Sequence, residues 1–148
     1  MPLTELALTP SQPEQRSWLS GAPPTDAELA TAKAAGVRAV LDLRPAAEGS
    51  AATDAARVTA AGLRTLRIEV AGPTGLTREN ATDFAKLVSD PAQGPLLLHC
   101  ATGNRVGALT ALKAVWLDGM TPDAALVLGR ATGLTRLEPA VRAALGLG

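Results

Sequence analysis

The feature that most constrains the fold of this chain is the alternation of short extended segments with helical ones. The segments at 37–43 (VRAVLDL) and 95–99 (PLLLH) are rich in apolar residues, as strands covered on both faces are. Two more extended segments are expected at 16–20 and 63–70. Helical patterns fill the intervals, at 25–35, 53–61, 77–89, 106–117, from 121 onward and at 138–145. This order predicts an α/β fold, a single three-layer domain with a mainly parallel central sheet of about four to five strands and helices on both faces.

Local signals mark where several helices begin and end. Thr25 followed by Glu28 forms a capping-box pattern, and Gly36 is placed as the residue that follows the end of that helix. Thr77 is expected to cap a helix, and Pro122 suits the first position of another. The segment 71–75, between the extended segment 63–70 and Thr77, shows neither a helical nor a strand pattern, so a loop is expected there.

The composition fits one globular domain. The chain has 148 residues, 47% of them hydrophobic but only 2% aromatic, so its core must consist of Ala, Leu and Val. Residues 1–16 are polar and interrupted by proline, and we expect a loose N-terminal arm there. Residues 17–148 are expected to form the folded domain.

Charge and hydropathy exclude several classes of function. The formal net charge is zero and Lys and Arg form no runs, so no nucleic-acid partner is expected. No apolar run is long enough for a membrane span, and the N-terminus lacks the pattern of a signal peptide. A single cysteine allows no internal disulfide. These features together predict a cytoplasmic protein without membrane association.

The stretch His99–Gly107, HCATGNRVG, predicts a loop that binds an anion. It joins an apolar strand to a buried helix, and ligands of parallel sheets bind where loops leave the carboxyl ends of strands. The backbone N–H groups at the start of the helix can then point at an anion, with the guanidinium of Arg105 as a two-pronged clamp. The expected anion-binding residues are Ala101, Thr102, Gly103, Asn104 and Arg105.

Cys100 is the candidate nucleophile of this loop. A lone cysteine in such a domain is most often a small buried hydrophobic residue. Its position after the strand, with the helix start and Arg105 close by, instead favours a thiolate. His99 is expected to support the loop by a hydrogen bond to its backbone. Arg44, at the end of a neighbouring strand, is a candidate for a second positive contact to an anionic substrate.

Three stretches resemble the tyrosine and dual-specificity phosphatase superfamily. They are LSGAPPTDAEL (19–29), GVRAVLDLRPAAE (36–48) and HCATGNRVG (99–107). They are most similar to the bacterial branch of small tyrosine-phosphatase-like proteins, found also as the phosphatase-like part of beta-lactamase hydrolase-like proteins. The resemblance covers about residues 18–118.

The resemblance implies a cysteine-phosphatase-like fold and a cysteine-dependent hydrolysis of phosphomonoesters. Cys100 would attack phosphorus to form a phosphocysteine, and Arg105 would bind the phosphoryl oxygens. The substrate would be a phosphorylated small molecule or a phosphoprotein, phosphotyrosine included. No cofactor and no metal are expected, and the oligomeric state stays open.

The chain departs from the superfamily pattern at two places. Four residues separate Cys100 from Arg105 where five are usual, and no carboxylate occurs from Val70 to Gly75, where the family places its general acid. The general acid is therefore unknown, with candidates among Asp42, Glu48, Glu69, Glu79 and Asp83. Two alternatives follow: a rhodanese-like sulfurtransferase with a persulfide on Cys100, and an anion-binding module without catalysis.

Overall fold

The computed structural model describes residues 3–147. Within them, five strands form one sheet in the order β1-β2-β5-β3-β4. β2, β5, β3 and β4 run parallel to one another, and β1 is antiparallel to β2. The mainly parallel sheet predicted from the sequence is confirmed. The strands are β1 (Thr4–Ala7), β2 (Arg16–Gly21), β3 (Ala39–Asp42), β4 (Arg64–Arg67) and β5 (Leu96–His99).

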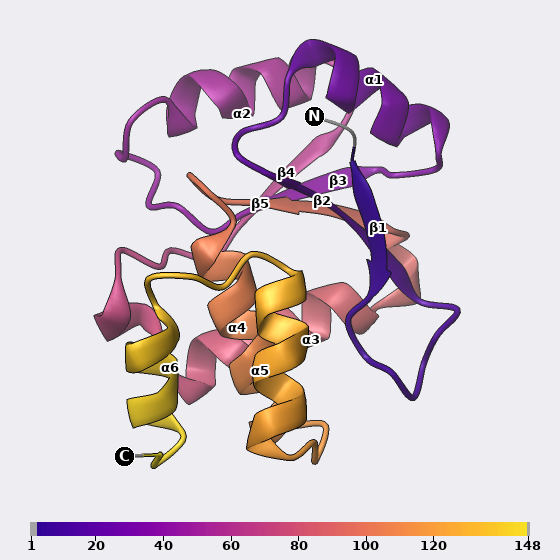
Figure 1. The fold of residues 1–148 in the computed structure, drawn as a ribbon. Helices are drawn as coiled ribbons and strands as arrows, with labels where there is room; N and C mark the ends of the chain where they lie inside the picture. Colours follow the sequence, from indigo (N-terminus) through magenta and orange to yellow (C-terminus); the bar gives the residue numbers. More distant parts are fainter. Residues whose placement is uncertain (1–2, 148) are drawn as a thin grey trace.

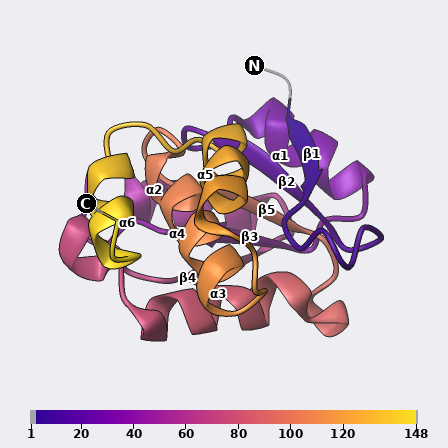
Figure 2. The ribbon, with the colours of Figure 1, turned by 60° about the horizontal axis from the view of Figure 1, so that its bottom comes forward.

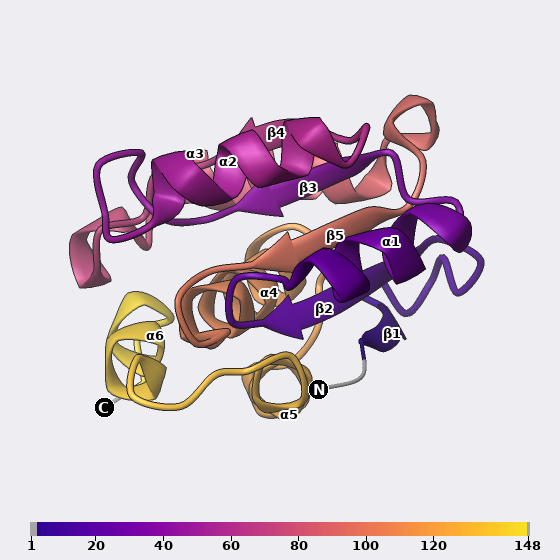
Figure 3. The same ribbon diagram turned by 90° about the horizontal axis from the view of Figure 1, so that it is seen from above.

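Helices cover both faces of this sheet, as predicted. α1 and α2 lie on one face, and α3 to α6 lie on the other (Figure 1). Figure 2 shows the layer of four helices with α4 and α5 in its middle, and Figure 3 shows α1 and α2 lying along the strands. The helices are α1 (Asp26–Ala34), α2 (Ala51–Ala60), α3 (Arg78–Ser89), α4 (Asn104–Trp116), α5 (Pro122–Ala131) and α6 (Glu138–Ala144).

The core consists of two apolar clusters, one on each side of the sheet. Val40 and Leu97 belong to the smaller cluster, with residues of α1 and α2. Their sequence neighbours Leu41 and Leu98 belong to the larger one, with Phe84 and residues of α4. Side chains of a strand alternate between its faces, so this division is what a sheet buried on both sides requires.

The carboxyl ends of the parallel strands meet at one edge of the sheet. Asp42 of β3 is in register with Arg67 of β4 and with His99 of β5. Gly21, at the end of β2, pairs with His99 from the other side. The Cys100 loop therefore leaves the sheet between the ends of β2 and β3, with the end of β4 beyond β3.

Most predicted boundaries agree with the structure to within a few residues. The capping box is present, with the Glu28 N–H donating to Thr25 Oγ1 at 3.1 Å and the Thr25 N–H donating to Glu28 Oε1 at 2.9 Å. The strands expected at 37–43 and 63–70 are regular over only four residues each. Their ends still lie alongside one another, because the Val70 N–H donates to the Leu43 carbonyl at 3.0 Å.

The prediction of a loose arm at 1–16 is wrong for the described part of that segment. Residues Thr4–Ala7 form β1, and Leu8 is only 2% exposed in the larger core cluster. The Thr9 hydroxyl accepts a hydrogen bond from the buried Lys113 ammonium at 2.7 Å. β1 forms because the outer edge of β2 offers unpaired backbone groups, a partner that the local sequence cannot reveal. Residues 1 and 2 lie outside the described part.

The loop expected at 71–75 contains a short 3₁₀ turn, Pro73–Gly75, in which the Gly75 N–H donates to the Gly72 carbonyl at 2.9 Å. A proline at its first position fixes a backbone angle suited to such a turn.

Among residues 3–147, no helix has both the length and the apolar character needed to cross a bilayer.

Candidate active site

The loop between β5 and α4 carries the predicted nucleophile. Cys100 directly follows β5 and is fully buried, and its Sγ accepts a hydrogen bond from the Gly103 N–H at 3.0 Å. The chain turns here because Gly103 has a φ of 93°, in the left-handed region that favours glycine. α4 starts at Asn104, so its positive end and the unpaired N–H groups of its first turn adjoin the loop. This geometry can bind an anion next to Cys100.

Ala101 and Thr102, two of the predicted anion-binding residues, are exposed on the outside of the loop. Beside them is a hollow of about 190 Å³ whose walls are neutral. It is lined by Thr4, Leu19, Ser20, Gly21, Thr102, Gly103, Ala131, Thr132 and Gly133. Substrate groups next to the loop on this side would meet small, uncharged residues.

Arg105 is held by a carboxylate and a carbonyl. Its Nη1 donates to Glu48 Oε1 at 2.9 Å and to the Val70 carbonyl at 2.8 Å, and its Nη2 donates to Glu48 Oε2 at 2.5 Å. The side chain of Arg105 is 14% exposed and that of Glu48 is 33% exposed. Hydrogen bonds from Arg105, against a smaller effect of burial, hold the pKa of Glu48 below its ordinary value. Glu48 is therefore ionised at neutral pH and orients the guanidinium in a two-pronged pair.

The pairing of Glu48 with Arg105 bears on the search for a general acid. An acid must carry a proton at working pH, and the lowered pKa of Glu48 opposes this. Glu69 accepts a hydrogen bond from the Ala46 N–H at 2.9 Å, and Glu79 and Asp83 are exposed on α3. The Val70 carbonyl accepts a hydrogen bond from Arg105, so the loop that begins at Val70 adjoins the site. This loop contains no carboxylate up to Gly75.

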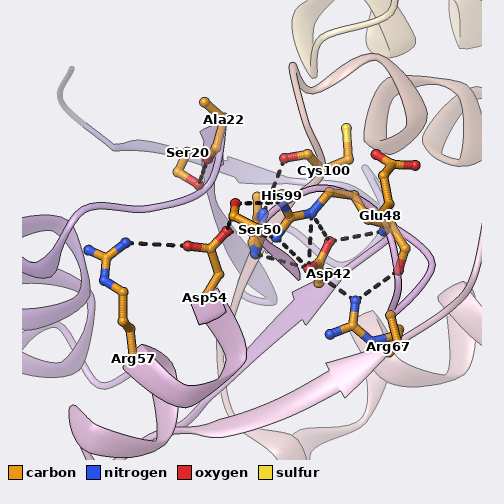
Figure 4. Close-up of polar contacts among 12 residues, drawn as sticks. Ser20, Ala22, Asp42, Glu48, Ser50, Asp54, Arg57, Arg67, His99 and Cys100 are labelled. Atoms are coloured by element: carbon orange, nitrogen blue, oxygen red, sulfur yellow. Dashed lines mark hydrogen bonds and ion pairs between the residues drawn. The ribbon is translucent and has the colours of Figure 1, made fainter. Parts of the chain in front are cut away.

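Arg44 lies at the predicted edge of the sheet, but its side chain does not make the predicted contact. It was expected to contact an anionic substrate, but it is 3% exposed and its guanidinium is bound by two carboxylates. These are Asp42 and Asp54, both labelled in Figure 4. Nη2 lies 2.8 Å from Asp42 Oδ2 and 3.0 Å from Asp54 Oδ2. The prediction is wrong because Asp42 and Asp54 are themselves buried, and a buried charge needs a partner of opposite sign. The position of Arg44 at the end of a strand does not reveal which buried carboxylates will lie next to it in the fold.

We call the buried Asp42, Arg44 and Asp54, together with the exposed Ser50 and the half-buried Arg67 that bind them, the buried ion cluster. Burial alone would raise the pKa values of Asp42 and Asp54, but hydrogen bonds and nearby arginines outweigh burial and both pKa values are lowered. Ser50 donates to Asp54 Oδ2 at 2.7 Å. Arg67 Nη1 donates to the Arg44 carbonyl at 2.8 Å and to Asp42 Oδ2 at 3.1 Å.

The buried ion cluster fixes the segment that presents Glu48. Arg44 and Ser50 flank Glu48 in the sequence, and both are tied to Asp54 of α2. Sequence analysis did not identify this support. Asp54, in the first turn of α2, was the one sequence signal for this support. An acidic residue at that position is more often an exposed charge at the start of a helix, so it did not stand out.

The imidazole of His99 contacts the backbone of the Cys100 loop. It is 1% exposed, and its Nδ1 lies 3.2 Å from the Cys100 carbonyl oxygen. A carbonyl can only accept, so Nδ1 carries the proton in this contact. Burial lowers the pKa of His99 despite the nearby Asp42 carboxylate, whose Oδ2 is 3.9 Å from Nε2. A neutral imidazole therefore braces the backbone of the nucleophile.

Asn104 was expected among the anion-binding residues, but its side chain turns the other way. Its Oδ1 accepts hydrogen bonds from the Thr135 N–H at 2.9 Å and the Leu137 N–H at 3.2 Å. The side chain thus joins the Cys100 loop to the segment between α5 and α6, which was not connected with the site from the sequence. Only its backbone N–H remains a candidate for the anion.

Within the described residues, no three His, Cys, Asp or Glu side chains are grouped so that they could hold a metal ion. The polar groups around Cys100 are instead those of an oxyanion site: backbone N–H groups, a guanidinium and a helix start.

Comparison with known proteins gives the site a family context. The family model described as "DSP-PTPase phosphatase fused to NAD+ Kinase" matches residues 6–137. No curated protein matched the sequence.

Several solved structures share the fold. A DUF442 protein from Shewanella putrefaciens, described as a candidate phosphatase, is 22% identical, with a TM-score of 0.65 over 97% of this chain and 85% of that one. A kinase-associated phosphatase with its catalytic cysteine replaced by serine is 14% identical, with a TM-score of 0.71 over 100% and 98%. The catalytic domain of the PP-IP phosphatase Siw14 from S. cerevisiae is 16% identical, with a TM-score of 0.69 over 87% and 78%.

Proposed function

Because this chain belongs to the family of DSP-PTPase phosphatases, we propose that it hydrolyses phosphomonoesters with Cys100 as nucleophile and Arg105 as the phosphoryl-binding cation. The observation that carries the proposal is the loop at the start of α4. There the sulfur of Cys100 accepts a backbone N–H, and Arg105 is oriented by Glu48. These groups match the two requirements of the reaction, a nucleophile and donors for the phosphoryl oxygens.

The reaction has two displacement steps. In the first, the Cys100 thiolate attacks phosphorus, the S–P bond forms and the bond from phosphorus to the leaving oxygen breaks. The leaving group departs with the electron pair of that bond as an oxyanion and takes a proton from water. The backbone N–H groups of residues 101–105 and Arg105 bind the three other phosphoryl oxygens. In the second, water attacks the phosphocysteine, the S–P bond breaks, and inorganic phosphate leaves with the thiolate restored.

Nucleophile substitution tests the proposal directly. We expect the wild-type protein to hydrolyse p-nitrophenyl phosphate, and Cys100→Ser to abolish the hydrolysis. Arg105→Ala should lower kcat/KM by about 10²–10³-fold, the loss typical of one strong oxyanion donor. Arg64→Ala is a matched control, because Arg64 begins β4 at the opposite edge of the sheet. Hydrolysis that survives Cys100→Ser would rule out this site.

Sulfur transfer is the second candidate, because the four residues between Cys100 and Arg105 make a smaller ring of N–H donors. It predicts thiocyanate formation from thiosulfate and cyanide, and a persulfide on Cys100 in the mass spectrum. A protein that only binds anions would instead bind phosphate without turnover of any phosphoester. Cys100-dependent hydrolysis with no thiocyanate would dispose of both alternatives.

We also propose the finer assignments of partner and compartment. The loop at the start of α4, with Arg105, supports a phosphorylated small molecule or phosphoprotein as substrate. A net charge of zero argues against a nucleic acid. A catalytic thiol works in its reduced form, which the cytoplasm maintains, so we assign the protein to the cytoplasm. Fractionation of cells that produce the tagged full chain tests the assignment.

A further inference from the structure

The segment between α5 and α6, residues 132–137, packs directly on the catalytic loop. In Figure 1 it passes over the N-terminal end of α4 on its way to α6. Gly133, with a φ of 118°, lies so close that a Cβ there would be 2.5 Å from the Gly103 carbonyl oxygen. Gly107 of α4 approaches the same segment, since a Cβ there would be 2.2 Å from the Leu134 nitrogen. The segment therefore forms one side of the site.

Asn104 fixes the exposed part of this segment. Its Oδ1 accepts the N–H groups of Thr135 and Leu137, the two residues that flank Arg136. The backbone of Arg136 is thus held on both sides by a residue that begins α4, next to the loop. Arg136 itself is exposed.

Arg136 is an uncompensated positive charge at this edge of the molecule. In the part of the chain that the structure describes, it takes part in no ion pair or side-chain hydrogen bond. The nearest carboxylate in the sequence, Glu138, is bound by Arg130 at 2.7 Å and by Arg142 at 3.7 Å. By contrast, the charges of Arg44 and Arg105 are balanced by their own carboxylates.

We propose that Arg136 binds a second anionic group of the substrate, beside the phosphoryl group held by the catalytic loop. This inference rests on the proposed function and names its substrate class: compounds with a second phosphoryl group, either linked directly to the first or attached to a neighbouring carbon. A cation that the protein leaves unpaired beside an anion site adds both attraction and selectivity for such a compound.

The chemistry of the site favours the directly linked member of this class. The loop from Val70 to Gly75 offers no carboxylate to protonate an alkoxide. Leaving groups that are already weakly basic need that proton least, and a phosphate released from a phosphoanhydride is one of them. Arg136 would also offset the negative charge that such a leaving group carries.

Binding measurements separate this inference from the question of turnover. Calorimetry on the Cys100→Ser protein at fixed ionic strength would compare three probes. These are inorganic phosphate, methylenediphosphonate as the directly linked pair, and 2,3-bisphosphoglycerate as the neighbouring pair. We expect at least one of the two-group probes to bind about tenfold more tightly than phosphate, the effect of one charge-assisted contact.

Three substitutions in the Cys100→Ser protein test whether Arg136 causes the tighter binding of the two-group probe. Arg136→Ala should lower the affinity ratio of that probe to phosphate about fivefold to tenfold, and Arg136→Lys should retain most of the ratio. Arg142→Ala removes the same charge from nearby α6 and should leave it intact. The inference is overturned if Arg136→Ala keeps the full preference for a two-group probe, or if Arg142→Ala loses as much of it. It is also overturned if the Cys100→Ser parent shows no such preference. The proposed function fails separately, if the protein with Cys100 shows no Cys100-dependent hydrolysis of p-nitrophenyl phosphate.

Discussion

At the scale of single residues, the pair of Arg105 and Glu48 decides how the site receives an anion. Glu48 engages both Nη1 and Nη2 of Arg105, each through a different oxygen. The Val70 carbonyl is a further fixed acceptor on Nη1. These contacts use both N–H groups of Nη1 and one of Nη2, so Nε–H and the second Nη2–H are left to bind a phosphoryl group. A guanidinium fastened at three points loses little freedom on binding its ligand, which favours a role for Glu48 in orientation.

Glu48→Gln tests this role. The amide retains an oxygen acceptor but loses the charge, so Arg105 is held less firmly. We expect kcat/KM for p-nitrophenyl phosphate to fall about tenfold, the value of one charge-assisted hydrogen bond. Glu79→Gln, on the exposed first turn of α3, is the matched control and should have little effect. An increase in activity would instead mean that Glu48 competes with the substrate for Arg105.

Arg44 and Asn104 show what single residues do not reveal in a sequence. Both were correctly placed at the carboxyl edge of the sheet, because strand ends and helix starts are local patterns. Their side chains nevertheless face buried carboxylates and backbone N–H groups, respectively, instead of the anion site. These partners come from α2 and from the segment after α5, so side-chain direction depends on contacts distant in the sequence.

At the scale of elements, the buried ion cluster joins β3, β4 and α2. Arg44 is its central cation, because it is the direct partner of both buried carboxylates. Arg57 also contacts Asp54, at 3.3 Å, but its side chain is 37% exposed. Arg44, inside the cluster, should therefore matter for stability, whereas solvent screens the contact of Arg57 with Asp54 from outside it.

Arg44→Met should be strongly destabilising. Methionine fills similar space but leaves Asp42 and Asp54 without their shared partner, and breaking a buried pair costs about 3–5 kcal/mol. Urea denaturation would measure this loss in the free energy of unfolding. Arg57→Ala, the matched control, should cost less than about 1 kcal/mol. Equal effects of the two substitutions would contradict the central place of Arg44.

The same cluster predicts how stability depends on pH. The pKa values of Asp42 and Asp54 are lowered from the ordinary 3.8, so the unfolded chain binds protons more readily than the folded one. Their contribution to stability is fully present above that value and is lost as the pH falls through the lowered folded values. We expect the free energy of unfolding to decrease below about pH 4–5, and less steeply in Asp54→Asn. An identical acid dependence in this variant would contradict the assignment.

The loop from Val70 to Gly75 makes a prediction about leaving groups. Without a carboxylate there, departure of an alkoxide should be slower by about 10²–10⁴-fold than in a phosphatase with a general acid. We expect kcat/KM for a series of aryl phosphates to rise steeply as the leaving phenol becomes more acidic, because the phenol departs in the first step. The measurement is a plot of log kcat/KM against phenol pKa. A flat plot would show that another residue supplies the proton.

At the scale of the whole molecule, the sequence predicted what depends on local patterns and missed what depends on remote pairing. Alternating apolar segments and helix caps were enough for a three-layer α/β domain, and the strand–loop–helix pattern located Cys100. β1 was missed because its partner is the edge of β2, across a proline-containing turn. A short polar strand carries too few apolar residues to be recognised without the neighbour that pairs with it.

Leu8→Ala tests whether this N-terminal segment is part of the fold. Leu8 is 2% exposed in the larger core cluster, and Thr9 beside it is bound to Lys113 of α4. A buried leucine cut back to alanine costs about 3 kcal/mol, whereas the same change in a loose arm costs nothing measurable. Leu117→Ala is the control, because Leu117 is 44% exposed, and it should change stability by less than about 0.5 kcal/mol. Equal urea midpoints for wild type and Leu8→Ala would mean that the segment folds independently of the core. A loss near the expected value would show that the sheet edge beyond β2 is stabilised by β1 and the residues that follow it.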